Sequence, residues 1–337
     1  MNKLAWDNAL CEPVLITYNR AASLQSTLEA FFAVSHGGMR FHVLDNASTD
    51  DTPQVIQSWQ ARWPGLIAHR NAYNIGGNAN ILRAQEISSS EYSWVLGDDD
   101  VWHLEHLDEV MEVLRTRAVD VIRLGWLVSS QSAGTSMDAV RLSSQENLFF
   151  ASLSMISATM VRRSIMTKYL PWAYMNCAYF YPQLVPCMMA FEAGPLVVYS
   201  VRQPLMTHTP STAPGYFVGD LAWYVAWFKT ARFLRQRPHK QHCIAEAVRY
   251  MIRPQHGFWV EMLWLLKIAL NGKVQNIPQR AYLGELFLAG SGWRGRIGLV
   301  FIAYSLCPRF VALGARRVYD HHYHKTSRAS VSDASRL

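Results

Sequence analysis

The chain has few cysteines, and their arrangement predicts no cross-links. Five cysteines are scattered over 337 residues, and none stands in Cys-x-x-Cys spacing. An odd, scattered set predicts neither a disulfide framework nor a zinc site, and it favours a reducing compartment. Residues 1–7 lack the apolar core of a signal peptide. We therefore expect a cytoplasmic protein.

The sequence also lacks a long uninterrupted apolar run. The best candidate is residues 297–314, but Pro308 and Arg309 interrupt it, and arginines bracket it on both sides (Arg294, Arg296, Arg316 and Arg317). A spanning helix needs about 20 apolar residues with few charges. We favour an interfacial helix here, keep a buried helix of the C-terminal region as the alternative, and rank a true span last.

Acidic residues are scarce in the second half of the chain. Residues 1–150 carry 10 Lys and Arg against 18 Asp and Glu, whereas residues 151–337 carry 22 against 7. Such asymmetry indicates an anionic partner for the basic half. No nucleic-acid recognition motif is present, so we expect no nucleic acid and prefer an anionic membrane surface. Aromatic residues interleaved with basic ones from about residue 220 fit a membrane interface, with ordinary core packing as the alternative.

What the chain does have is an alternation of short apolar strands and helical stretches. Strands are expected near residues 13–17, 41–45 and 91–96, with helices over 23–34, near 53–63 and from about residue 77. This alternation predicts βαβ units and a mostly parallel sheet. Ligands of such sheets bind outside the carboxyl ends of the strands. We therefore expect the polar residues that come after each strand to lie together at one edge.

The strongest single feature is a strand that runs into three carboxylates. Trp94, Val95 and Leu96 precede Gly97 and then Asp98, Asp99 and Asp100. Adjacent carboxylates raise one another's pKa, and a divalent metal shared with phosphates would reverse that cost. The alternative is capping of a helix that begins at Val101. Three consecutive aspartates exceed what a cap requires, so we favour a metal–phosphate site.

Four motifs occur in a fixed order: T-Y-N-R at 17–20, D-N-A-S-T-D at 45–50, N-I-G-G-N-A-N at 74–80 and G-D-D-D at 97–100. Together they resemble the family 2 glycosyltransferases of the GT-A fold, over about residues 12–210. The resemblance implies an α/β fold with a mostly parallel sheet flanked by helices. It also implies transfer of a sugar from a nucleotide-sugar donor, assisted by Mn²⁺ or Mg²⁺. We expect a catalytic domain at 1–215, a helical C-terminal region at 216–325 and a disordered tail at 326–337.

The resemblance also assigns roles by position. The turn at 17–20 and the start of the second motif would bind the donor, mainly its base: Thr17, Tyr18, Asn19, Arg20, Asp45 and Asn46. Asn78 and Arg83 would lie near the ribose or phosphates, and Asp98 near the ribose. Asp99 would be the metal ligand, supported by Asp100, and His208 would reach the metal or diphosphate. The alternative for His208 is a surface histidine in a polar loop.

Two departures from the family pattern affect these assignments. Members often carry Leu-Asp-x-Asp-Asp, whereas this chain has Gly97 at the first aspartate. The family's catalytic Glu-Asp pair precedes a glycine by about a dozen residues, and counting back from Gly194 reaches Pro182 and Gln183, which are not acids. An inverting transfer needs a base for the acceptor hydroxyl. The nearest acids along the chain, Glu192 and Asp220, are the candidates.

The middle of the chain would complete the domain. We expect a strand over 119–128, a polar loop over 129–144 that covers the donor, an apolar wall for a sugar over 148–161, and a strand over 196–201.

Two classes of function remain open. The first is a cytoplasmic glycosyltransferase, peripheral to the membrane, that extends a glycan, expected to be lipid-linked, in bacterial O-antigen or capsule assembly. The second is a non-catalytic nucleotide-sugar-binding or scaffolding protein of the same fold, for which the missing Glu-Asp pair is the argument.

Overall fold

The computed structural model describes residues 6–35, 38–116, 118–125, 127–207, 219–252, 294–308, 310–312 and 314. The described chain divides into two compact units. The first consists of residues 1–212 and 230–250, and the second of residues 213–229 and 251–337.

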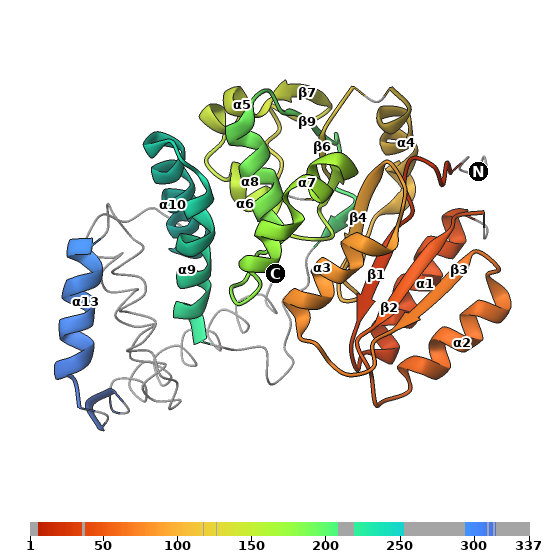
Figure 1. The fold of residues 1–337 in the computed structure, drawn as a ribbon, viewed down its shortest axis with the longest axis horizontal. Helices are drawn as coiled ribbons and strands as arrows, with labels where there is room; N and C mark the ends of the chain where they lie inside the picture. Colours follow the sequence, from red (N-terminus) through yellow and green to blue (C-terminus); the bar gives the residue numbers. More distant parts are fainter. Residues whose placement is uncertain are drawn as a thin grey trace, which may run out of the picture. The chain divides into compact units, whose positions relative to one another are not determined.

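A mixed sheet forms the centre of the first unit (Figure 1). Its strand order, among the described residues, is β3-β2-β1-β4-β8-β6-β9-β7. The neighbours β3, β2, β1 and β4 are parallel, β8 is antiparallel to β4 and β6, β9 is parallel to β6, and β7 is antiparallel to β9. The strands are β1 (Val14–Thr17), β2 (Phe41–Asp45), β3 (Leu66–Arg70), β4 (Tyr92–Leu96), β6 (Val121–Arg123), β7 (Thr135–Asp138), β8 (Thr159–Arg162) and β9 (Val197–Ser200).

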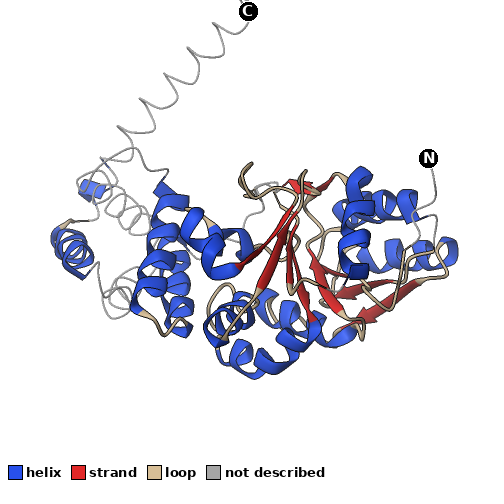
Figure 2. Cartoon of the chain, turned by 90° about the horizontal axis from the view of Figure 1, so that it is seen from above, coloured by secondary structure: helices blue, strands red, loops and turns tan. Residues whose placement is uncertain are grey.

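Helices cover both faces of this sheet (Figure 2). They are α1 (Ala21–Ser35), α2 (Thr52–Arg62), α3 (Gly77–Ile87), α4 (Leu107–Thr116), α5 (Ala139–Gln145), α6 (Phe149–Ser154), α7 (Arg163–Met175) and α8 (Leu184–Ala193). The expected α/β architecture with a mostly parallel sheet is confirmed.

Side-chain alternation along β1 and β2 assigns α1, α2 and α4 to one face of the sheet and α3 to the other. Leu15 and Val43 belong to the large buried cluster that α1, α2 and α4 complete. Their neighbours Val14 and Leu44 point the other way and pack with Ala84 of α3. Period-two alternation thus buries both faces, as a parallel sheet requires.

The region after the three aspartates differs from the expectation. Val101 does not begin a helix: Val101–Trp102 is strand β5, antiparallel to β10 (Met206–Thr207), and α4 starts only at Leu107. A β-branched and an aromatic residue favour extended backbone. The Trp102 ring also packs edge-on against Phe31 and Trp94, at 5.0 and 5.7 Å between ring centroids.

The predicted polar loop at 129–144 is also partly ordered. It contains β7, which pairs with β9, and the start of α5, whose first turn is capped by Asp138. The strand expected over 119–128 is shorter, at Val121–Arg123, while the strand expected over 196–201 is confirmed as β9. Strand β3 was not predicted from the sequence, because only Leu66 in it is buried and the other four side chains are partly or fully exposed.

In the C-terminal part, α9 (Gly219–Thr230) and α13 (Arg294–Leu306) contribute to the second unit, and most of α10 (Arg237–Ile252) belongs to the first. The boundary predicted at residue 215 and the tail predicted at 326–337 lie outside the described residues. Within the part of the chain that is described, no helix is both long and apolar enough to cross a membrane.

A buried polar chain lies on the sheet near the start of β2. His42 Nε2 donates to Glu12 Oε2 at 3.0 Å, and His42 Nδ1 is hydrogen-bonded to His69 Nε2 at 3.0 Å. Arg40 pairs with the same carboxylate, Nη1 to Oε1 2.7 Å. Burial, with the charges of His42 and Arg83, lowers the pKa of His69. The folded protein therefore favours the neutral His69 ring.

This pKa shift makes the free energy of unfolding depend on pH. A histidine whose folded pKa is depressed takes up its proton more readily in the unfolded chain, so stability falls as the pH drops below about 6.5. We expect His69→Gln to reduce that acid loss, measured by urea unfolding at a series of pH values. His106→Gln, at an exposed position, is the control and should keep the wild-type slope. An identical slope in His69→Gln and wild type would contradict the assignment.

Candidate active site

The end of β4 is joined to the turn after β1 by the carboxyl of Asp98. Thr17 Oγ1 donates to Asp98 Oδ2 at 2.6 Å, and Arg20 Nη1 donates to Oδ1 at 3.1 Å. Asp98 is only 5% exposed. Burial raises the pKa of this carboxyl to about 6, although the Thr17 hydrogen bond and the Arg20 charge act to lower it. Asp98 is therefore directed into the protein, where it fixes the strand end.

Asp99 and Asp100 are more exposed and face a common space. A Cβ atom placed on Gly97 would stand 3.2 Å from Asp99 Oδ1 and 3.4 Å from Asp100 Oδ2. Arg20 Nη1 also pairs with Asp99 Oδ2 at 2.5 Å. An aspartate at position 97 would push against both carboxylates, which explains why glycine fits here. Because β5 follows directly and α4 starts at Leu107, capping of a helix does not explain these residues.

The two carboxylates fit a divalent ion as a partial ligand set. Mg²⁺ and Mn²⁺ prefer carboxylate oxygen and commonly complete their shell with water and phosphate. Over the residues that the structure describes, no group of three or more His, Cys, Asp or Glu side chains converges on one point. Asp99 and Asp100 would therefore hold such an ion only together with oxygens from elsewhere.

The turn after β1 is locked to the turn after β2. Asn19 has φ 53° and Ala47 has φ 64°, a left-handed backbone that asparagine tolerates better than alanine. Asn19 Oδ1 accepts from the Thr49 amide at 2.7 Å, and the Asn19 amide donates to Ser48 Oγ at 2.9 Å. Tyr18 at the tip is 41% exposed and free to contact a ligand face.

Asp45, the last residue of β2, is buried and carries an ion pair with Arg70, the last residue of β3. Its Oδ1 accepts from the Ser48 amide at 2.9 Å, and Arg70 Nη2 donates to the Ser48 carbonyl at 2.8 Å. The carboxyl ends of β2 and β3 therefore form one charged corner beside the β1 turn.

Four asparagines shape the loop between β3 and α3. Asn71 Nδ2 donates to Asn46 Oδ1 at 2.7 Å and to Asn80 Oδ1 at 2.8 Å, while Asn46 Nδ2 donates to Asn74 Oδ1 at 2.8 Å. The loop ends at Gly76, whose φ of 83° favours glycine. Asn46 is thus positioned through other asparagines at the same edge of the sheet.

The two candidate site residues on α3, Asn78 and Arg83, have different surroundings. Asn78 Nδ2 donates to the backbone carbonyls of Tyr179 and Cys177, at 2.8 and 3.0 Å, so its amide joins α3 to the segment before α8. Arg83 is exposed on α3, and its charge acts on His69 and Tyr174.

Of the two candidate bases, Glu192 has described contacts, and they are with other residues than the aspartates. Glu192, in the last turn of α8, accepts from His239 Nδ1 at 2.8 Å and from the Gln236 amide at 3.2 Å. Because β9 follows α8 and runs in the same direction as β4, this turn lies toward the amino edge of the sheet, whereas the aspartates follow its carboxyl edge. Asp220 lies in α9 with its side chain outside the described residues, as is the whole of His208.

Three further residues make contacts that sequence reasoning did not predict. Gln183 begins the first turn of α8, donates from Nε2 to the Ser154 carbonyl, and has a buried Oε1 with no hydrogen-bond partner among the described residues. Arg70 was missed because its strand was not recognised, although a basic residue just before N-x-x-N was a usable signal. Ser157 lies in the wall predicted over 148–161; its hydroxyl accepts from the Gly97 amide at 2.8 Å, a contact that the sequence did not predict.

Comparison with known proteins supports one family. Residues 14–162 match the sequence profile described as glycosyl transferase family 2. Abequosyltransferase RfbV of Salmonella typhimurium is 29% identical over 105 residues, which are 30% of this chain and 32% of that protein. An uncharacterized glycosyltransferase of Nostoc is 26% identical over 106 residues, 32% of this chain and 33% of that protein. The chain thus spans about a third of the length of these curated relatives.

Solved structures match over most of the chain. The S. aureus TarS 1-349 structure in complex with UDP has a TM-score of 0.55 at 15% identity, covering 91% of this chain and 92% of that one. Mannosyltransferase PcManGT from Pyrobaculum calidifontis, in complex with GDP-Man and Mn²⁺, has a TM-score of 0.51 at 11% identity, covering 88% and 85%. At these identities the likeness shows the fold, which is that of the GT-A glycosyltransferases. Residues 14–162 are thus similar to glycosyl transferase family 2.

Proposed function

We propose that the protein is a metal-dependent, inverting glycosyltransferase that moves a sugar from a nucleotide-sugar donor to a glycan. The observation that carries this proposal is the pair of carboxylates, Asp99 and Asp100, that face one space at the carboxyl end of β4. They stand beside the polar turns that come after β1, β2 and β3. A strand edge with this composition suits a nucleotide diphosphate and its cation.

The donor would lie across these turns. In the proposal, the base contacts the corner made by Asp45 and the 17–20 turn, and Asn46 and the asparagine loop line its side. Arg20 keeps Asp99 oriented by its ion pair. Asp99 and Asp100 would hold the ion, Mn²⁺ or Mg²⁺, which when bound neutralises the diphosphate as it leaves. TarS with UDP and PcManGT with GDP-Man and Mn²⁺ support this class of donor and ion.

A second candidate function has its own support. Gln183 stands where the family resemblance leads to an acid, and the carboxylate of Glu192 is engaged by α10. A protein that binds the nucleotide sugar without transferring it would show the same features. In the catalytic proposal, Asp220 is the remaining candidate to accept the proton of the acceptor hydroxyl.

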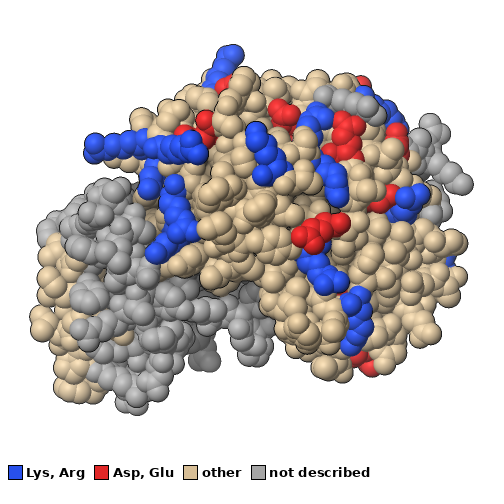
Figure 3. All heavy atoms as spheres, in the orientation of Figure 1, with Lys and Arg blue, Asp and Glu red and all other residues tan. Residues whose placement is uncertain are grey.

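The acceptor is proposed to be lipid-linked, in O-antigen or capsule assembly at the inner face of the membrane. Support comes from α13 and the residues after it. Leu299, Ile302 and Leu306 are 52%, 56% and 76% exposed, and their spacing places them along one side of α13. Phe310, after the end of this helix, is 74% exposed. Over the α/β unit, by contrast, the acidic and basic side chains visible in Figure 3 are intermixed. A stripe of exposed apolar side chains near basic residues is suited to binding an anionic membrane surface.

The metal requirement is tested with Asp99→Ala. Removing the exposed carboxylate should abolish sugar release from a panel of UDP- and GDP-sugars with Mn²⁺, and the thermal midpoint should stay near that of wild type. Asp108→Ala, an exposed aspartate on α4, is the matched control and should retain turnover. Wild-type binding of these donors that is equally tight in excess EDTA would count against the metal. Donor binding without any release or transfer by wild type would favour the non-catalytic alternative.

The position of the nucleotide's base is tested with Asp45→Ala. Losing a charge-assisted contact should weaken UDP or GDP binding by about 1–3 kcal/mol in calorimetry. Arg70 is half exposed and can be solvated, so the fold should persist. Mn²⁺ affinity should change little. An unaltered nucleotide Kd would mean that the nucleotide's base does not contact Asp45.

Membrane association is tested with the double variant Leu306→Asp and Phe310→Asp. Wild type should co-sediment with vesicles that contain phosphatidylglycerol, and less so at high salt, because exposed charges are screened. The double variant should lose most of this binding, since two apolar contacts are replaced by like-charged ones. Val140→Asp, exposed on α5, should behave as wild type. Equal sedimentation of the double variant and wild type, or indifference to lipid charge, would contradict the proposal.

A further inference from the structure

We infer that Ser157 is a positioning residue for the carboxylate loop, which we define as residues 97–100. The ligand of this loop rests on the proposed function, but the contact itself does not. Ser157 lies between α6 and β8 and is 1% exposed. It touches the loop at Gly97, directly before the three aspartates.

Ser157 contacts the end of β4 through both its side chain and its backbone. Its Oγ accepts from the Gly97 amide at 2.8 Å, and its carbonyl accepts from Trp94 Nε1 at 3.0 Å. Trp94 is fully buried in the main core. The indole therefore fixes the Ser157 backbone relative to the strand, and the hydroxyl then fixes the first peptide of the loop.

The hydroxyl also lies beside the carboxylates of Asp99 and Asp100, which are partly exposed. The position of a Gly97 Cβ would be 3.5 Å from Ser157 Oγ, 3.2 Å from Asp99 Oδ1 and 3.4 Å from Asp100 Oδ2. Three oxygens thus surround one small space. If the Gly97 amide lost its acceptor, that peptide would be free to rotate, and both carboxylates would move with it.

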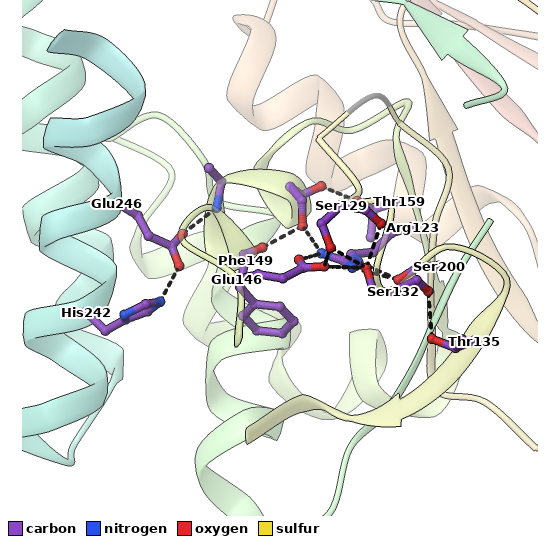
Figure 4. A network of polar contacts seen from close by, with 12 residues as sticks. Arg123, Ser129, Ser132, Thr135, Glu146, Phe149, Thr159, Ser200, His242 and Glu246 are labelled. Carbon is purple, nitrogen blue, oxygen red and sulfur yellow. Dashed lines mark hydrogen bonds and ion pairs between the residues drawn. The ribbon is translucent and has the colours of Figure 1, made fainter. Parts of the chain in front are cut away.

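The segment that carries Ser157 is held by buried charges (Figure 4). At the start of α6, Glu246 Oε2 accepts from the Ala151 amide at 2.9 Å. One residue later, Arg123 Nη1 donates to Ser152 Oγ at 3.0 Å, and Arg123 is itself paired with Glu146. Arg123 and Glu246 are both fully buried. Breaking such pairs is costly, so α6 is a rigid support for residues 155–158.

This support extends to the last turn of α6. The Ser154 carbonyl accepts from Gln183 Nε2 at the start of α8. Only Met155 and Ile156 separate this point from Ser157. The position of the Ser157 hydroxyl is therefore decided by the core and by α8, and not by the loop that it holds.

The experiment compares Ser157→Ala with Ser154→Ala. The Ser154 hydroxyl donates within α6, to the Ala151 carbonyl at 2.8 Å, so this variant makes the same chemical change in the same segment without touching the loop. Two quantities are measured on the full chain. One is hydrogen exchange of the backbone amides in residues 94–100, without ligand. The other is Mn²⁺ affinity in the presence of UDP or GDP, with the thermal midpoint recorded alongside.

In Ser157→Ala we expect the Gly97 amide to exchange about tenfold faster and Mn²⁺ affinity to fall about tenfold, the size expected for one lost buried hydrogen bond. Ser154→Ala should match wild type in both. Gly97→Ala is the second variant: its methyl would contact Asp99 Oδ1, and it should lower Mn²⁺ affinity while every carboxylate is retained.

Unchanged exchange at Gly97 in Ser157→Ala would overturn the inference. So would faster exchange with unchanged Mn²⁺ affinity, or equal losses in Ser154→Ala. If Ser157→Ala fails to fold, full Mn²⁺ affinity in Gly97→Ala would overturn it. If wild type binds no Mn²⁺ with either nucleotide, the proposed function fails, and the exchange measurement still decides whether Ser157 holds the loop.

Discussion

The buried carboxyl of Asp98 joins the end of β4 to the turn after β1, and the candidate site depends on that junction. Its two oxygens accept from Thr17 and Arg20, which come from a different strand. A buried carboxyl is costly unless its hydrogen bonds are made, and both partners are present here. The same guanidinium reaches Asp99, so one arginine links the interior aspartate to its exposed neighbour.

Beyond this junction, the site is built from short polar contacts between turns and not from one pocket. The β1 turn contacts the β2 turn through Asn19, the β2 and β3 ends meet through Asp45 and Arg70, and asparagines fix the loop into α3. Each contact orders a loop whose backbone would otherwise have many conformations. The surface that these turns form is therefore largely preformed, which would lower the entropic cost of binding a ligand there.

Much of this could be predicted from particular residues. The four motifs and the strand–helix alternation indicated the family, the parallel part of the sheet and the edge at which the polar residues meet. The expected helix at Val101 was wrong, because a two-residue pairing with Met206 depends on a segment more than a hundred residues away. The hydrogen bonds of Asn78 to Tyr179 and of Glu192 to His239 also join segments far apart in the sequence, so no local pattern predicts them.

The sequence by itself determined the fold class, the family and the presence of a carboxylate cluster at a strand end, because period-two burial and strand-terminal motifs are local properties. The tertiary structure decided which aspartate points inward, why position 97 is a glycine, and that Ser157 stands next to the cluster. These depend on how β8, α6 and α8 pack against β4. Such packing is set by side-chain volumes and buried hydrogen bonds between distant segments, and no local pattern encodes it.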